Sequence, residues 1–176
     1  MKVLIVFFCA FLSLSLLSAC RRPQPKTAPK TTWSNAHSVD FNQELSAREE
    51  LKIATFLAHY RELSMQKTNS GLRYMIYKNG IGESLAKTGQ YVNVRVKIEL
   101  LNGTICYETP KDETENFVLE KSDKESGIHE VLRLMRKGDR AKLILPSYLG
   151  HGLLGDRQRI PPQSILYIDL KLIELQ

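Results

Sequence analysis

Residues 92–100 limit what this chain can fold into more than any other segment. An apolar side chain stands at every second position from Val92 to Leu100, and a polar or charged one, such as Arg95 or Lys97, stands at each position between. Successive side chains of a β-strand point to opposite faces, so this alternation predicts a long strand with one face in a core and the other in water. The chain is therefore expected to form an antiparallel sheet that covers a core on one side.

Further strands are predicted before and after this segment. Asn102-Gly103 is a hairpin signal that turns the long strand back into a strand at 104–107, and a short strand at 117–119 continues the pattern as a meander. The remaining segments with the apolar pattern of strands are 72–77, which ends before Asn79-Gly80, and 140–145 and 166–175.

One short helix is predicted between the strands. Ile128, Leu132 and Met135 repeat at the i, i+4, i+7 spacing of a helix face, and Lys137-Gly138 supplies a cationic last turn and a glycine stop. Strands that enclose a single helix belong to the α+β class. We expect a twisted antiparallel sheet wrapped around this helix, with a loop rich in glycine and proline between the last two strands.

A longer helix is predicted ahead of the sheet, over residues 46–65. Ser46-Ala47-Arg48-Glu49 has the spacing of a capping box, and an apolar stripe at helical spacing follows, made of Ile53, Phe56, Leu57 and Tyr60. The apolar stripe of a helix is normally buried against another apolar surface. Two alternatives are open: the stripe docks on the following domain, or it is a face for a partner or a second copy.

Residues 1–19 have the features of a bacterial export signal. Lys2 precedes an apolar run over residues 3–12, and Leu17-Ser18-Ala19-Cys20 resembles a lipobox, where the leader is cleaved and the cysteine thiol receives a diacylglyceryl group. The alternative is an uncleaved membrane anchor, because residues 3–19 just reach the length that spans about 30 Å of hydrocarbon. We predict a signal peptide at 1–19 and a lipid anchor on Cys20.

Residues 20–44 are predicted to form a lipidated flexible tether, 45–70 a helical extension, and 71–176 the globular domain. The stretch 21–40 has three prolines, many Ser and Thr residues and no hydrophobic period. Most of the net charge of +6 also lies before residue 41, in Lys2, Arg21, Arg22, Lys26 and Lys30. The near balance of charge in the rest argues against nucleic-acid binding, while a basic tether favours anionic lipid headgroups.

The residues offer no set for metal, nucleotide or nucleophilic chemistry. Once Cys9 is removed with the signal and Cys20 is acylated, Cys106 is the one remaining thiol, and four histidines are scattered without ligand spacing. Gly150-His151-Gly152-Leu153-Leu154-Gly155 matches G-x-G-x-x-G, but Pro161-Pro162 follows where a helix would have to hold a pyrophosphate. No G-x-S-x-G sequence is present. We therefore expect no cofactor, no metal and no internal disulfide.

A specific motif pattern fills the C-terminal part of the chain. Its parts are Leu132-x-x-Met135-x-x-Gly138-x-Arg140-Ala141-x-Leu143, Leu145-Pro146-Ser147, Gly150-His151-Gly152, Gly155, Ile160-Pro161-Pro162 and Leu166-x-x-Asp169-x-x-Leu172. In this order and spacing they resemble the C-terminal half of FKBP-type peptidyl-prolyl cis-trans isomerases, and the similarity runs from about residue 71 to residue 175. The resemblance implies an FKBP-like fold, a twisted antiparallel sheet curled around one short helix, here with an N-terminal helical extension.

The resemblance also implies a subgroup and an activity. Gly71-Leu72-x-Tyr74 after a helical extension is similar to the bacterial lipoprotein members, among them the FKBP-type lipoprotein associated with gliding motility in Bacteroidetes. The implied activity is peptidyl-prolyl cis-trans isomerisation, which needs no nucleophile, metal or cofactor. It needs a dry pocket that strips water from the imide and holds the twisted amide, whose rotation barrier is about 18–20 kcal/mol.

Apolar walls of that pocket are carried over residue by residue. Ile160, just before Pro161-Pro162, matches the isoleucine of the pocket wall, and Phe117 matches a core aromatic residue of the neighbouring strand. Ile128 stands where the family has a tryptophan on the pocket floor, and Ile168 replaces a phenylalanine of the last strand. The resemblance therefore implies an apolar but shallower floor.

At the polar positions of the pocket, this chain differs from the family more than it does at the apolar walls. Val96 stands at the position of the family's pocket tyrosine, and Cys106 and Tyr107 stand where Phe-Asp follows the turn, so both polar groups are replaced. His151 replaces a loop tyrosine that donates to the substrate carbonyl, and Glu125 stands where a backbone N–H binds substrate. The candidates for catalysis are His151, Tyr107 and Ile160, and the substitutions predict activity below that of a typical member.

Two functions remain open from the sequence. The first is an exported, lipid-anchored isomerase that assists the folding of proline-containing envelope polypeptides, at the outer membrane and facing the periplasm, since Arg21-Arg22 after Cys20 provides no acidic surface-export signal. The alternative is a catalytically weak or inactive binding module in a secretion or gliding-motility complex. A third interpretation is a general chaperone that uses the apolar stripe of the long helix as its client surface.

Overall fold

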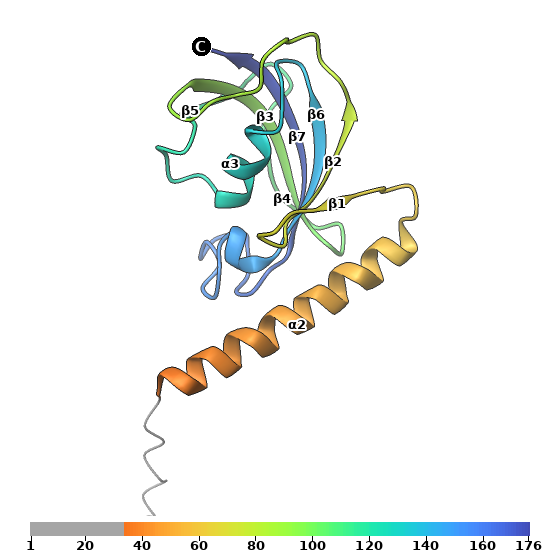
Figure 1. Ribbon diagram of the computed structural model, residues 1–176, viewed down its shortest axis with the longest axis vertical. Coiled ribbons are helices and arrows are strands. Elements are labelled where there is room, and N and C mark those ends of the chain that lie inside the picture. Colours follow the sequence, from red (N-terminus) through yellow and green to blue (C-terminus); the bar gives the residue numbers. More distant parts are fainter. Residues whose placement is uncertain (1–33) are drawn as a thin grey trace, which may run out of the picture. The chain divides into compact units, whose positions relative to one another are not determined.

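A seven-stranded sheet curled around one short helix is the main element of the structure, a computed structural model (Figure 1). Every strand pair is antiparallel, and the helix, α3 (Ser126–Leu132), lies between β5 and β6 in the chain. The strands are β1 (Gln66–Lys67), β2 (Arg73–Lys78), β3 (Tyr91–Leu100), β4 (Ile105–Glu108), β5 (Glu115–Val118), β6 (Arg140–Leu145) and β7 (Leu166–Leu175). The predicted α+β class is confirmed.

The structure describes residues 34–176, and Ser38–Gln176 form one compact unit. The predicted signal peptide, the lipid anchor on Cys20 and most of the predicted tether lie outside the described residues. Within residues 34–176, no helix has both the length and the apolar character that crossing a membrane requires.

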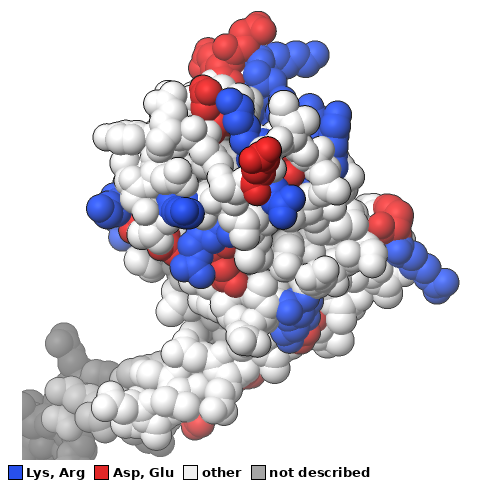
Figure 2. All heavy atoms as spheres, turned by 45° about the horizontal axis from the view of Figure 1, so that its top comes forward, with Lys and Arg blue, Asp and Glu red and all other residues white. Residues whose placement is uncertain are grey.

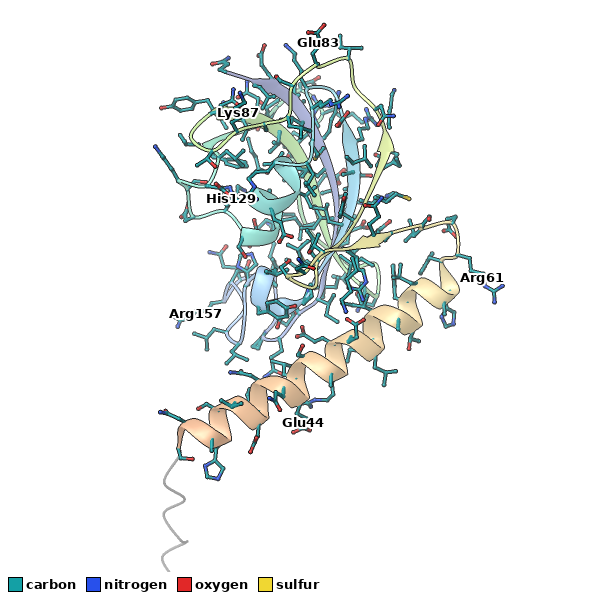
Figure 3. The ribbon with its side chains drawn as sticks, in the orientation of Figure 1. Glu44, Arg61, Glu83, Lys87, His129 and Arg157 are labelled. Carbon is teal, nitrogen blue, oxygen red and sulfur yellow. The ribbon has the colours of Figure 1, made fainter. Side chains whose placement is uncertain are left out.

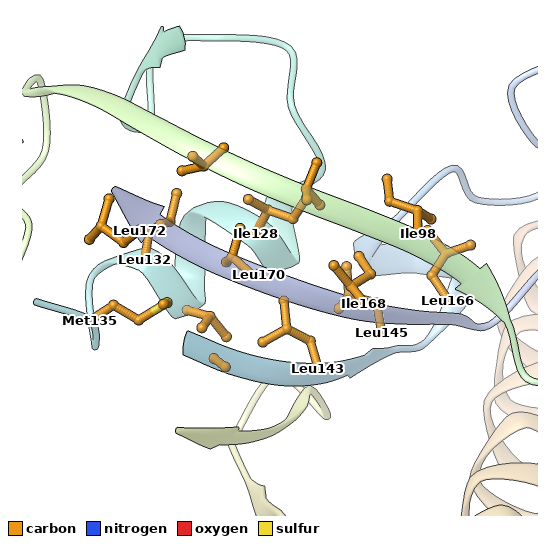
Figure 4. Close-up of a cluster of buried hydrophobic side chains, with 14 of the residues drawn as sticks. Ile98, Ile128, Leu132, Met135, Leu143, Leu145, Leu166, Ile168, Leu170 and Leu172 are labelled. Atoms are coloured by element: carbon orange, nitrogen blue, oxygen red, sulfur yellow. The ribbon is translucent and has the colours of Figure 1, made fainter. Parts of the chain in front are cut away.

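The core lies on the concave face of the sheet. The order β1-β2-β6-β7-β3-β4 places β7 between β6 and β3, and it pairs with β3 along its whole length and with β6 over residues 166–171. Alternate side chains of these strands face α3, whose Ile128 and Leu132 are at most 1% exposed, as is Met135 just after it (Figure 4). The alternation of residues 92–100 is thus confirmed, with Val92, Val94, Val96 and Ile98 buried.

The predicted meander is wrong, because β4 and β5 both pair with β3. Since β7 occupies the other edge of β3, the two short strands share one edge, with the loop 109–114 between them. Thr109 ends the first of them: its N–H donates to the carbonyl of Val96 (2.9 Å) and its hydroxyl accepts the N–H of Val96 (3.0 Å). Pro110 follows and has no N–H for the ladder, so the chain leaves the edge and returns at Glu115.

The N-terminal helix α2 (Asn35–His59) begins earlier and ends sooner than the predicted 46–65, so residues 35–44 of the predicted tether are helical. Ser34 precedes its first turn, where its hydroxyl accepts the N–H of His37 (3.4 Å) in the manner of an N-cap. Ser46 lies inside the helix. Both serines have cap chemistry, so the local sequence does not decide between them.

Helix α2 docks on the sheet, as the first of the two alternatives predicted. Ile53 is completely buried and forms a separate apolar cluster with Ile144 of β6 and Ile165. Glu50 adds ion pairs with Arg73 of β2 and with Lys67 (3.2 Å). Of the predicted stripe, Phe56 and Leu57 are half-buried and pack on this cluster, whereas Tyr60 remains 46% exposed.

Candidate active site

The apolar residues predicted for the pocket lie in one cluster. They come from β3, β4, β5, α3, the β6–β7 loop and β7, and they are Val96, Cys106, Phe117, Ile128, Ile160 and Ile168. None is more than 9% exposed, and Ile128 and Ile168 are 1% and 0% exposed. The predicted floor residues are therefore inside the core rather than on an open surface, and a substrate reaches them only if the side chains that cover them move.

Tyr107 lies at the edge of this cluster, half-buried, and its hydroxyl donates to the carboxylate of Asp156. Asp156 belongs to the loop between β6 and β7, far away in the chain. The resemblance implied that the pocket had lost both of its polar groups. The structure shows that a phenol and a carboxylate are nonetheless paired there, with the carboxylate supplied by a different element.

Asp156 also organises the loop that carries Ile160. Its Oδ1 accepts three backbone N–H groups, from Gln158 (2.8 Å), Arg159 (2.9 Å) and Ile160 (2.7 Å). A carboxylate that accepts N–H groups from the next few residues is the geometry of an Asx turn. Asp156 was missed in the sequence because its motif is local and common, while its partner Tyr107 is a long-range contact.

The electrostatics of this cluster favour a charged carboxylate and a neutral phenol. Loss of hydration would raise the pKa of Asp156, but the hydroxyl of Tyr107 and the three N–H groups outweigh it and hold the pKa well below its usual range. The hydrogen bond to Asp156 raises the pKa of Tyr107. Burial raises the pKa of the Cys106 thiol, so Cys106 stays protonated and serves as an apolar side chain.

Arg159 closes the same edge of the cluster. Its guanidinium lies over the ring of Tyr107, 5.2 Å from the centroid, and its Nη1 donates to the carbonyl of Cys106 (3.1 Å). The thiol of Cys106 is 3.5 Å from the carbonyl oxygen of Arg159. Two contacts thus join Arg159 of the β6–β7 loop to Cys106 of β4, one through the side chain of each residue. They hold the neighbouring Ile160 against the core.

His151 and Glu125, both predicted for the site, form a pair. Nε2 of His151 lies 3.0 Å from Oε1 of Glu125, whose side chain is only 8% exposed. When Nε2–H donates to Glu125 in the neutral ring, Nδ1 is an acceptor, and both nitrogens are donors only in the imidazolium form. While Nε2 contacts Glu125, the predicted donation from His151 to a substrate carbonyl falls to Nδ1.

Helix α2 supports the loop that carries His151. Glu49 is 2% exposed, and its Oε2 accepts the N–H of Ser147 (3.0 Å). The carbonyl of Ser147 in turn accepts the N–H groups of Gly150 (3.0 Å) and Gly152 (2.7 Å), the residues on either side of His151. A residue of the predicted helical extension thus positions the candidate site, which the sequence did not indicate.

The fold is shared with a solved isomerase. A peptidyl-prolyl cis-trans isomerase from Pseudomonas syringae pv. tomato superposes with a TM-score of 0.60 and 23% sequence identity, over 70% of this chain and 90% of that one. The predicted FKBP-like fold, an antiparallel sheet with one helix and an additional N-terminal helix, is confirmed.

Sequence comparison shows the family. Residues 82–173 match the family model of FKBP-type peptidyl-prolyl cis-trans isomerases. The isomerase FkpA of Buchnera aphidicola subsp. Schizaphis graminum is 32% identical over 145 residues, which are 81% of this chain and 56% of that protein. A probable FKBP-type isomerase of Haemophilus influenzae is 30% identical over 112 residues, 63% of this chain and 45% of that protein. The chain belongs to the FKBP-type peptidyl-prolyl cis-trans isomerase family, and it spans about half the length of these curated relatives.

Proposed function

We propose that this protein catalyses cis-trans isomerisation of X-Pro peptide bonds in polypeptides. The observation that carries the proposal is the match of residues 82–173 to the isomerase family, in a fold that brings the predicted apolar residues into one cluster under the β6–β7 loop. Uncatalysed rotation takes about tens to hundreds of seconds, because amide resonance must be broken.

The site supports this chemistry through desolvation rather than covalent catalysis. The imide oxygen hydrogen-bonds to water best when the amide is planar, so an apolar surface that removes this water destabilises the planar form relative to the twisted one. Ile160 is the wall residue in this mechanism, and the Tyr107–Asp156 pair holds it in position. Among the described residues, no group of three or more His, Cys, Asp or Glu side chains could hold a metal ion.

The test is NMR exchange between the cis and trans forms of proline peptides, with wild type and Ile160→Val. This change removes one methyl group and is expected to lower kcat/KM severalfold while it costs only about 0.5–1.5 kcal/mol of stability. Ile81→Val is the matched control, since Ile81 is 94% exposed. Equal activity of wild type, Ile160→Val and Ile81→Val would contradict the proposed role of this wall.

We also propose that the protein is exported and lipid-anchored through Cys20, and that it assists the folding of envelope proteins from the periplasmic side of the outer membrane. The lipobox-like Leu17-Ser18-Ala19-Cys20 and the subgroup features Gly71-Leu72-x-Tyr74 support this proposal and its relation to the gliding-motility lipoproteins. Mass spectrometry of protein purified from membranes should find a diacylated N-terminal Cys20. A mature N-terminus at another residue, or an intact leader, would refute it.

The second candidate is a weakly active or inactive binding module in a secretion or motility complex. It is favoured by the burial of Ile128 and Ile168, which leaves the floor closed in this conformation. No exchange catalysis by the wild type, together with a partner that Ile160→Val releases, would support it. The general chaperone interpretation is weakened, because Ile53 of the proposed client stripe is already covered by Ile144 and Ile165.

A further inference from the structure

Three cationic side chains stand in one row on the outer face of the sheet. Lys171 of β7 lies directly opposite Arg140 of β6 on one side and Arg95 of β3 on the other. Residues opposite each other share a face, and neighbouring strands are about 4.8 Å apart. Like charges in this position are destabilising.

On the face seen in Figure 2, basic and acidic side chains lie beside each other. The next row along the strands has Asp169 between Lys142 and Lys97, and Lys142 pairs with it (3.2 Å). In residues 34–176, by contrast, none of Arg140, Lys171 and Arg95 forms an ion pair with a carboxylate. Arg95 donates only to the backbone carbonyl of Glu113 (3.2 Å).

Asp169 is not available to neutralise the row. Besides Lys142, it accepts the hydroxyl of Tyr77 at 2.9 and 3.1 Å. Burial and this hydrogen bond raise the pKa of Tyr77, so the phenol remains a donor that holds Asp169 in place. In the described part of the chain, the three cationic groups of the row therefore have no carboxylate in an ion pair with them.

A cavity of about 250 Å³ opens over these residues. Four cationic side chains line it, Arg95, Lys97, Arg140 and Lys171, against two carboxylates, Glu108 and Asp169. The lining thus carries an excess of two positive charges. A phosphate monoester or inorganic phosphate carries about −1.5 to −2 at neutral pH, which matches this excess.

We propose that this cavity binds a phosphate group. The two guanidinium groups offer paired N–H donors to phosphate oxygens, and the ammonium of Lys171 between them supplies a point charge. Binding removes the repulsion along the row, so the ligand recovers stability that the free protein lacks. The group is carried either by a soluble phosphate or by a lipid headgroup, which share this chemistry.

The test compares the full chain with Lys171→Gln, using inorganic phosphate as the probe and NaCl of equal ionic strength as the reference. Phosphate is expected to raise the melting temperature of wild type. In an NMR titration with phosphate, the dissociation constant of Lys171→Gln should be at least tenfold higher than that of wild type. Lys87→Gln is the matched control, because it makes the same change of charge at an exposed site away from the row (Figure 3). It should bind phosphate like wild type.

A second readout separates a ligand site from a structural cluster. Without phosphate, Lys171→Gln should melt at or above the wild-type temperature, because it relieves repulsion. Destabilisation by Lys171→Gln would overturn the proposal. So would equal phosphate titrations of Lys171→Gln and Lys87→Gln combined with no Lys171-dependent binding to the vesicles described next.

The source of the phosphate is tested with vesicles. Flotation with vesicles that contain phosphatidic acid, against vesicles of phosphatidylcholine alone, reports on a headgroup, and the phosphate titration reports on a solute. Binding that is lost in Lys171→Gln and kept in Lys87→Gln supports the site. If this is seen with vesicles, the phosphate belongs to a lipid headgroup; if it is seen in the titration, the phosphate belongs to a solute. Absence of Lys171-dependent binding in both arms rejects it.

Discussion

Replacement of Ile53 by Ala tests whether α2 is part of the folded domain. Ile53 has no exposed surface and contacts a cluster formed by Ile144 and Ile165. Truncation of a buried Ile to Ala costs about 2–5 kcal/mol, and the cost falls when neighbours can collapse into the space. Since half-buried Phe56 and Met65 border this cluster, we expect about 2–3 kcal/mol. For a chain of this size this lowers Tm by about 5–10 °C.

The assay is urea unfolding followed by circular dichroism, with thermal melts as a second measurement. Leu51→Ala is the matched control, because Leu51 lies on the same helix and is 69% exposed. Its effect should stay within about 0.5 kcal/mol. If Ile53→Ala unfolds at the same urea concentration as Leu51→Ala, α2 does not depend on this docking contact and the reasoning is refuted.

Three further outcomes are expected at the candidate site. Folding lowers the pKa of Asp156, so this carboxylate stabilises the fold above its unfolded-state pKa, and the stabilisation is lost as pH falls toward the folded-state pKa. Tyr107→Phe removes one of the donors that lower this pKa and should reduce the stabilisation. The drop in Tm between about pH 5 and pH 3 should therefore be smaller in Tyr107→Phe than in wild type. Gly155→Ala should lower Tm and kcat/KM far more than Gly152→Ala. Both glycines have positive φ, but only at Gly155 would a Cβ lie 2.1 Å from a backbone oxygen, that of Ile160. Equal melting temperatures of the two variants would contradict this. Glu49→Ala leaves a buried N–H without an acceptor and should cost about 1–3 kcal/mol and lower kcat, whereas Glu49→Gln, which retains an acceptor oxygen, should recover most of both.

Local patterns were sufficient for the strands and for α3. The alternation in 92–100 and the apolar run in 166–175 predict β3 and β7 to within a residue, because each pattern follows from how that strand's own side chains alternate. The same holds for Ile128 and Leu132 on α3. The start of α2 was missed because Ser34 and Ser46 offer similar cap chemistry, and the sequence contains no signal that excludes one of them.

Most of the strand pairing in the sheet could be learned only from the tertiary structure. The edge of β3 shared by β4 and β5 depends on β7 occupying the other edge, and β7 is contributed by the last residues of the chain. The docking of α2 through Ile53 likewise depends on Ile144 and Ile165, which are distant in sequence. A periodic pattern identifies which face of an element is apolar, but it does not identify what covers that face.

The amino-acid sequence alone was enough to predict the family motif around Ile160-Pro161-Pro162, the apolar side chains of the candidate site and the one hairpin at Asn102-Gly103. The folded structure was needed to show that Tyr107 donates to Asp156, that Glu49 of α2 accepts the N–H of Ser147 in the loop of His151, and that the predicted floor is closed. The physical reason is the range of the interactions. Side-chain alternation and turn chemistry act between near neighbours in the chain, whereas the Tyr107–Asp156 and Ser147–Glu49 hydrogen bonds join residues that are 49 and 98 positions apart.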